Sequence, residues 1–208
     1  MEEIIESIIQ MEWDFFDKVQ NEGGRASCQD DWDTFSKMRR SQYMAWSEPL
    51  LESWKADLIL AREEGRNPLT EKYGYMMCIS DPQNTEETAR SLPPVSFEKK
   101  QTARRIVDRL IPQNEAFRGR YPRVSGRGRP LRTSEEPAAG WTSIETYELG
   151  ELWTYSQRTL ELFEENLDAF EKKGGSYPET VVENGLKLRG FETLDQAEEY
   201  LAKREKRK

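Results

Sequence analysis

The chain has 208 residues, of which 36% are hydrophobic and 34% charged, and its formal net charge is −8 at pH 7. This length suits one domain, or one domain with an appendage, and the polar composition is typical of a soluble protein. No stretch has the roughly 20 consecutive apolar residues that a membrane-spanning helix needs, and the first fifteen residues are too acidic for a secretory signal. We therefore expect a cytoplasmic protein with no membrane partner.

Cysteine and histidine usage narrows the chemistry further. The chain contains two cysteines, Cys28 and Cys78, and no histidine. The cysteines are far apart and form no CxxC motif, so a disulfide framework is excluded, and zinc sites and histidine-dependent triads are disfavoured. We predict no metal site, and the residue types indicate no particular cofactor.

Helical periodicity dominates the chain, and helix-breaking residues interrupt it at short intervals. No useful strand-like alternation and no internal repeat is present, so the pattern predicts a single all-α domain of about seven or eight helices. The predicted helices cover residues 2–20, 30–46, 47–65, 71–77, 86–90, 97–111 and 142–172, with a final helix from about 193.

Prolines, glycines and capping residues predict further features where the helices begin and end. Asn67-Pro68 is expected to form a turn, and Pro112 is expected to kink or end its helix. The segment 118–140 is rich in Arg, Gly and Pro and is predicted to be an irregular basic loop. The longest helix, 142–172, opens with a predicted capping box of Thr142 and Glu145, and residues 178–208 are predicted to form a C-terminal helical appendage.

A basic segment stands out in this acidic chain. Between Glu98 and Arg132 there are eleven basic and three acidic residues, a local charge of +8, so the remainder sums to −16. Such a segment either pairs with acidic surface of the same chain or binds an anion or an acidic partner. Extended nucleic-acid binding is disfavoured because the net field of the chain repels polyanions.

Charged and polar residues fall on faces of the predicted helices that are otherwise apolar. Arg39, Gln42 and Asp31 share the apolar face of the second helix, Glu12 lies on that of the first, and Glu145 on that of the longest. A buried charge without a partner costs several kcal/mol. These groups are therefore expected to meet one another, water or a ligand.

Two interpretations of these residues stay open. In the first, Arg39 forms an ion-pair network with Glu12 or Glu145 that fixes the register of the helices, or Glu145 merely closes its capping box. In the second, the helices enclose a pocket in which Arg39 clamps an anionic group and Gln42 and Arg25 orient it. Glu145, or Glu12 as second choice, would then be the catalytic acid or base.

Other motifs are weaker. Glu145-x2-Glu148 followed by Glu165-x2-Asp168 resembles the magnesium signature of all-α nucleoside-triphosphate pyrophosphatases. In one uninterrupted helix Glu148 and Glu165 would be about 25 Å apart, too far to share an ion, and only a break in that helix would bring them together.

Single nucleophilic and phenolic residues also have two readings each. Cys28 follows Arg25 and precedes a helix, which suits a reactive thiol, but without a histidine base a small buried cysteine is favoured. Tyr73, Tyr147 and Tyr155 suit hydroxyl donors or ordinary packing residues.

Longer motifs carry a family resemblance. They are Glu12-Trp13, Gly23–Gln29, Met38–Gln42, Glu71–Met77 and Thr142–Ser156. Together they resemble the bacterial family known as domain of unknown function 4125, over about residues 4–201. The resemblance implies no particular activity. It implies a helical module that binds a substrate or a partner for a nucleotidyltransferase-like protein. Glu148 stands where we expect a basic residue in relatives.

The leading hypothesis is a helical protein that binds a small, anionic metabolite in an interhelical pocket and acts on it through carboxylate acid/base chemistry. The alternative is a non-catalytic module that docks a protein partner through its basic stretch 118–132. The candidate catalytic residues are Glu145 and Glu12. The candidate ligand-binding residues are Arg25, Cys28, Gln29, Asp31, Arg39, Gln42, Lys72, Tyr73, Tyr147 and Tyr155.

Overall fold

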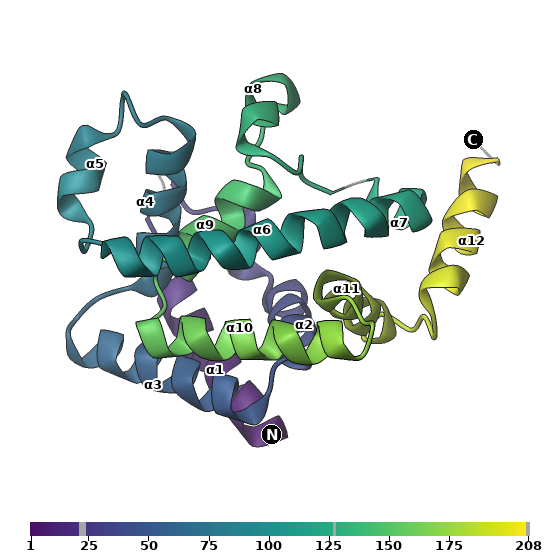
Figure 1. The fold of residues 1–208 in the computed structure, drawn as a ribbon, viewed down its shortest axis with the longest axis horizontal. Coiled ribbons are helices and arrows are strands. Elements are labelled where there is room, and N and C mark those ends of the chain that lie inside the picture. Colours follow the sequence, from purple (N-terminus) through teal and green to yellow (C-terminus); the bar gives the residue numbers. More distant parts are fainter. Residues whose placement is uncertain (21–23, 127, 207–208) are drawn as a thin grey trace.

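The computed structural model describes residues 1–20, 24–126 and 128–206, and every regular element in these ranges is a helix (Figure 1). The described ranges hold twelve α-helices and two short 3-10 helices. The all-α prediction is therefore confirmed. The predicted number of seven or eight helices is too low, because segments expected to be loops form short helices and the longest expected helix is divided.

The first half of the chain forms α1 (Glu2–Phe16), η1 (Ser27–Asp30), α2 (Trp32–Tyr43), α3 (Glu48–Glu63), α4 (Pro68–Ser80), α5 (Glu86–Ser91) and α6 (Phe97–Arg120). The second half forms α7 (Pro122–Ser125), η2 (Thr133–Glu135), α8 (Glu136–Ala139), α9 (Ile144–Leu152), α10 (Gln157–Lys172), α11 (Tyr177–Lys187) and α12 (Leu194–Glu205).

Side-chain caps define where the helices begin. The side chains of Asp31, Asn67, Ser96, Ser143 and Ser156 each accept a hydrogen bond from a backbone N–H in the first turn of the following helix. Each such cap stabilises its helix by about 1 kcal/mol, because that amide has no partner within the helix. The turn expected at Asn67-Pro68 is instead the start of α4.

The helix predicted over 142–172 breaks at residues 153–156. Ser156 caps α10, and its backbone N–H donates to Asp57 Oδ2 at 2.9 Å, so a partner from α3 stabilises the break. The predicted capping box is wrong as well. Ser143, not Thr142, caps α9, and the Glu145 carboxylate is bound elsewhere.

Conversely, α6 is longer than expected. It continues through Pro112 to Arg120, although proline removes one helical hydrogen bond. Leu110, Ile111 and Phe117 are all buried, so packing on both sides of the proline holds the helix together. A local breaker is overridden here by tertiary contacts.

The helices pack around one apolar core. α1 packs on α2, α3 and α4, while α10 lies between α3 and α6, as Figure 1 shows. α9 packs against both α4 and α6, which places this short helix in the interior. The core includes Ile8, Leu50, Leu58, Ile106 and Leu160, all without exposed surface.

The predicted loop is more structured than expected, and the two helices of the predicted helical appendage pack in different places. Segment 118–140 holds the end of α6, α7, η2 and α8 among its described residues, so it is not irregular throughout. α11 packs on α2 and α6, whereas α12 packs on α7 at the edge of the molecule (Figure 1). None of the helices in the described ranges has both the length and the apolarity needed to cross a bilayer.

Candidate functional site

Arg39 lies at the centre of a buried ionic network that joins α1, α2, α4 and α9. Its guanidinium donates to both carboxylate oxygens of Glu12, at 2.7 Å from Nε and 2.5 Å from Nη2. Nη1 donates to Glu151 Oε1 at 3.1 Å. All three side chains are almost completely buried.

The Glu12 carboxylate is fully engaged by protein donors. Besides Arg39, it accepts hydrogen bonds from Tyr43 Oη at 2.5 Å and Trp54 Nε1 at 3.1 Å. A buried carboxylate is tolerated only when its oxygens are satisfied in this way. The arrangement makes Glu12 a structural ion and leaves little room for a substrate.

Glu151 is the second carboxylate of the network. It accepts hydrogen bonds from the Lys72 ammonium, from Tyr155 Oη at 2.9 Å and from Gln42 Nε2 at 3.2 Å. Burial alone would raise the pKa of Glu151, but the positive charges of Arg39 and Lys72 outweigh burial and hold that pKa below its usual range. Glu151 is therefore ionised at neutral pH.

The close approach of two helices makes the contact with Lys72 possible. α4 and α9 pack tightly where Gly150 faces Met76 and the backbone oxygen of Lys72. Burial lowers the pKa of the Lys72 ammonium, but the Glu151 carboxylate more than compensates, and the net shift is upward. Lys72 is thus a buried cation with a dedicated carboxylate.

These contacts correct the proposed role of Arg39. Its five N–H groups are all used, since Nη2 also donates to Tyr43 Oη at 2.6 Å and Nη1 to Gln42 Oε1 at 3.0 Å. The guanidinium has no free edge for a ligand anion. The predicted ion-pair network is confirmed, with Glu12 as one partner and Glu151, not Glu145, as the other.

Glu145 lies elsewhere on α9. Its carboxylate pairs with Arg104 Nη1 at 2.6 Å and accepts the backbone N–H of Thr133 at 3.0 Å. Burial favours the neutral form, but these two partners outweigh it and lower the pKa of Glu145. The residue fastens the segment before α9 to α6, and its role as acid/base catalyst has no support in these contacts.

Sequence reasoning missed Glu151 for a physical reason. Glu145 and Glu151 are six residues apart, so about 600° of helical rotation puts them on different sides of α9. Thr146, Leu149 and Leu152 are buried together with both glutamates. A helix that is buried on several sides has no single core face, and a one-face projection cannot select the inward carboxylate.

Four other candidates form the connection between α1 and α2. Arg25 is exposed and pairs with two surface aspartates. Cys28 is exposed, so the buried position favoured for it is wrong, and Asp31 is an exposed helix cap and not an inward-facing residue. Gln29 is buried, and its Nε2 donates to the backbone oxygens of Phe16 and Val19. These contacts build the connection, and they do not bring the four side chains into the network of Arg39.

The predicted tyrosines lie around the network. Tyr155 is buried and bonds Glu151, and Tyr73 is half-buried on α4, where burial raises its pKa. Tyr147 is half-buried on α9, and its ring centroid lies 3.5 Å from Lys72 Nζ and 4.9 Å from Arg129 Cζ. Tyr147 therefore connects a cation of the buried network to a cation outside it.

A cavity of about 190 Å³ opens next to the network, and we call it the α9–α11 pocket. Its polar lining comes from α2, α6, α9, α11 and the segment before α9, and its apolar lining mainly from α11. The lining residues are Gln42, Leu110, Asn114, Arg129, Ile144, Tyr147, Glu148, Tyr177, Pro178, Val181 and Val182. Apolar walls with a few converging polar groups are typical of small-molecule sites.

Glu148 is the unusual group in this pocket. It is half-buried, and in the described part of the chain it has neither a hydrogen bond nor an ion pair. The neighbouring network is already neutral, because Arg39 and Lys72 balance Glu12 and Glu151. Burial, together with repulsion from Glu151, raises the pKa of Glu148 to about 7.

Arg129 supplies the positive charge of the pocket. Its segment is held to the start of α9, because the N–H groups of Ile144 and Glu145 donate to the oxygens of Pro130 and Leu131. Arg129 Nη1 donates to the backbone oxygen of Thr142 at 3.1 Å. Over the ranges that the structure covers, its guanidinium has no carboxylate partner, so its charge is available to a ligand.

The break at 153–156 does not assemble the pyrophosphatase-like motif. Asp168 pairs with Arg109, and Glu145 with Arg104. Among the described residues, no group of three or more potential metal ligands lies together. Glu148 belongs to the α9–α11 pocket and not to a carboxylate cluster.

Five arginines of the basic segment pair with carboxylates of the same chain. Arg104 pairs with Asp108 and Glu145, Arg105 with Glu164, Arg109 with Asp168 and Glu171, Arg120 with Glu179, and Arg123 with Glu198 and Glu205. Arg127 lies outside the described residues. The intramolecular interpretation is thus confirmed for these five arginines, and docking of a partner along 118–132 stays a prediction.

Comparison with known proteins gives one match. Residues 2–199 match the family described as "Protein of unknown function (DUF4125)". The resemblance predicted from the motifs is therefore confirmed over almost the whole chain. No curated protein and no solved structure matches the chain.

Proposed function

We propose that this chain, which belongs to the DUF4125 family, binds a small molecule with an anionic group in the α9–α11 pocket. One observation carries the proposal: Arg129 and Glu148 line the same pocket, and in the described ranges neither has a charged partner. An ionic group at an apolar pocket is stabilised when a ligand of opposite charge or a hydrogen bond meets it.

Each polar group has a role in this proposal. Arg129 binds the anionic group, because a guanidinium with free N–H groups recognises carboxylate or phosphate in a planar, two-point contact. Gln42 hydrogen-bonds the ligand beside it, and its own position is fixed by Arg39 and Glu151. Gln42 thus connects the buried network to the pocket lining.

The acid/base role moves from Glu145 and Glu12 to Glu148. Glu12 and Glu145 are both held by arginines, whereas Glu148 is unpaired in the described structure and its pKa is raised to about 7. A carboxyl group with a pKa near the working pH both gives and takes a proton readily. In this proposal Glu148 exchanges a proton with the bound molecule.

The proposal includes a cytoplasmic location. It is supported by two cysteines that do not pair with each other.

The test is a thermal-shift screen with inorganic phosphate, short mono- and dicarboxylates, sugar phosphates and nucleotides as probes, since selective binding raises the melting temperature. We expect at least one probe to stabilise the wild-type protein and Arg129→Met to lose that response. Arg90→Met, which changes an exposed arginine of α5, should respond like the wild type.

Glu148→Gln tests the acid/base part. It should still bind the stabilising probe, and the pH dependence of binding between about 6 and 8 should disappear. A wild-type protein that responds to no probe, or an Arg129→Met variant with an unchanged response, would contradict the proposal.

A further inference from the structure

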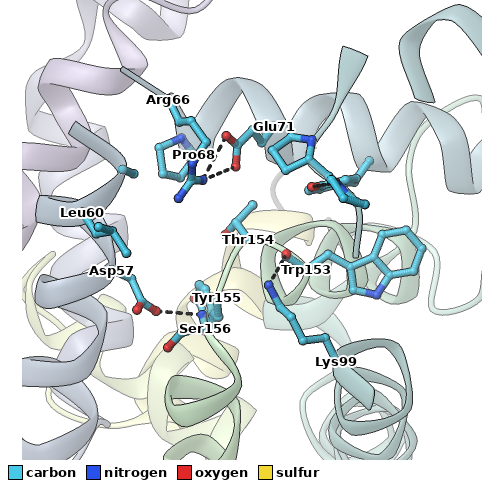
Figure 2. Close-up of a pocket in the computed structure, with 14 residues that line it drawn as sticks. Asp57, Leu60, Arg66, Pro68, Glu71, Lys99, Trp153, Thr154, Tyr155 and Ser156 are labelled. Carbon is cyan, nitrogen blue, oxygen red and sulfur yellow. Dashed lines mark hydrogen bonds and ion pairs between the residues drawn. The ribbon is translucent and has the colours of Figure 1, made fainter. Parts of the chain in front are cut away.

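A second cavity, of about 280 Å³, lies where α3, the start of α4, the start of α6 and the break between α9 and α10 meet (Figure 2). It shares no lining residue with the α9–α11 pocket. Its charged lining residues are Asp57, Arg66, Glu71 and Lys99.

Lys99 projects into this cavity from the first turn of α6. Its Nζ donates to the backbone oxygen of Trp153 at 3.2 Å, and no carboxylate in the described structure pairs with it. An ammonium has three N–H donors, so at least one remains for a ligand. Burial lowers the pKa of Lys99, in keeping with a cation that the protein alone does not neutralise.

Arg66 offers a second free donor. Its Nε donates to Glu64 at 2.8 Å, and its Nη1 to both oxygens of Glu71 at 3.1 Å. Its Nη2 donates to no residue within the described ranges. Figure 2 shows Arg66 and Lys99 reaching toward the cavity from different elements.

Asp57 offers the complementary acceptor. Its Oδ2 accepts the N–H of Ser156 at 2.9 Å and the hydroxyl of Thr159 at 2.6 Å. Its Oδ1 accepts nothing from the part of the chain that the structure describes. The cavity therefore has unused donors on Lys99 and Arg66 and an unused anionic acceptor on Asp57.

The charges of the lining cancel. Arg66 is neutralised by Glu71, and Lys99 balances Asp57 without contacting it through an ion pair. A ligand with several negative charges would be repelled by the carboxylates of Asp57 and Glu71. A ligand whose only charged group is one carboxylate would leave Asp57 Oδ1 without a hydrogen-bond donor. A net-neutral ligand that carries both an anion and a cation satisfies every unused group.

We propose that this cavity binds a small zwitterion of the α-amino-acid type, with its carboxylate on Lys99 Nζ and Arg66 Nη2 and its ammonium on Asp57 Oδ1. The apolar part of the lining, which includes Leu60, Pro68, Tyr75 and Pro93, accommodates the side chain of the zwitterion. The cavity is close to the lower end of the roughly 300–1,000 Å³ range of ligand pockets, which favours a ligand of this size.

The test is isothermal titration calorimetry of the full chain with each of the twenty standard amino acids as probe, at neutral pH. Acetate, propionate, propylamine and inorganic phosphate serve as single-charge probes. We expect at least one amino acid to bind, and each single-charge probe to bind at least about tenfold more weakly, a difference of ~1.4 kcal/mol.

Two variants locate the site. Lys99→Met should weaken amino-acid binding by about tenfold or more. Asp57→Asn should do the same while its amide oxygen still accepts from Ser156 and Thr159, so the break before α10 is preserved. Lys172→Met, at an exposed lysine at the end of α10, and Arg129→Met, in the other pocket, should both bind like the wild type.

Three results would overturn the proposal: no binding of any amino acid to the wild-type protein, equal affinity for propionate or phosphate, or unchanged binding by folded Asp57→Asn. Because Arg129→Met leaves this site intact, failure here is distinguishable from failure of the α9–α11 pocket. The melting temperature of each variant confirms that it is folded before titration.

Discussion

Arg39 and Glu12 are 27 residues apart in the chain and form a two-point ion pair in the centre of the molecule, where neither has appreciable exposure. The pair is stable only because its remaining donors and acceptors are satisfied by Gln42, Tyr43, Trp54 and Glu151. Burying two ions is expensive, and removing one partner leaves the other uncompensated. The network is therefore the point at which single substitutions should be most costly.

The first prediction concerns this pair. Glu12→Gln and Arg39→Met should each lower the free energy of unfolding by about 3–5 kcal/mol, because each leaves an uncompensated buried ion. The double variant should lose less than the sum of the two. Urea denaturation followed by circular dichroism measures all three.

Arg40→Met is the matched control, since the neighbouring arginine pairs with exposed Glu2 and Glu6, and it should cost about 1 kcal/mol or less. Equal losses for Arg39→Met and Arg40→Met would contradict the prediction.

The second prediction separates two glutamates of α9. Glu151→Gln should destabilise the fold by about 3–5 kcal/mol, because Arg39 and Lys72 lose a shared buried anion. Glu145→Gln should cost about 1 kcal/mol, because Arg104 is partly exposed and the amide oxygen still accepts the N–H of Thr133. Chemical denaturation of the two variants side by side is the measurement, and the reverse order of stabilities would show that the roles are wrongly assigned.

The third prediction is a pH dependence caused by Glu148. Its pKa rises from the ordinary 4.5 to about 7 on folding, so the folded state holds the proton more tightly than the unfolded state. The stability from this group is present in full below about pH 4.5 and is lost as the pH rises through 7, by up to about 3 kcal/mol. In the Glu148→Gln variant the side chain at this position does not titrate, so the free energy of unfolding should decline less as the pH rises.

Melting temperatures between about pH 5 and 8 test that expectation. Glu148→Gln should be similar to the wild type at the acidic end and more stable at the basic end. Glu115→Gln, at an exposed glutamate of α6, is the control and should follow the wild-type curve. A wild-type curve parallel to that of Glu148→Gln would rule out the raised pKa.

The fourth prediction concerns the contact between α4 and α9. A methyl group on Gly150 would lie 2.5 Å from Met76 Cγ and 3.0 Å from the backbone oxygen of Lys72. Gly150→Ala should therefore push the helices apart and destabilise the protein by about 1–3 kcal/mol. Gly119→Ala is the matched control in α6, where a methyl group meets nothing within 4 Å, and it should stabilise by up to about 1 kcal/mol. Thermal unfolding of both variants shows whether their shifts have opposite signs.

Local sequence patterns predict a good part of this structure. The spacing of apolar residues gives the all-α class, and the helix starts predicted near residues 30 and 97 agree with α2 and α6, because a cap needs only the next few residues. The same spacing places Glu12, Arg39 and Gln42 on inward faces, and the structure brings these three together. The motifs also carry the family membership, which spans residues 2–199.

Local sequence therefore predicts the helical class, many of the helix starts and the inward position of several ions, because these depend on neighbours within one or two turns. Contacts between distant segments are needed to explain why Glu151 and not Glu145 meets Arg39, why the chain breaks before Ser156, and why α6 continues through Pro112. The same contacts leave Glu148 unpaired in the described structure beside a neutral network. Such outcomes depend on which helices pack against each other, and partners from distant segments set the balance between burial and charge.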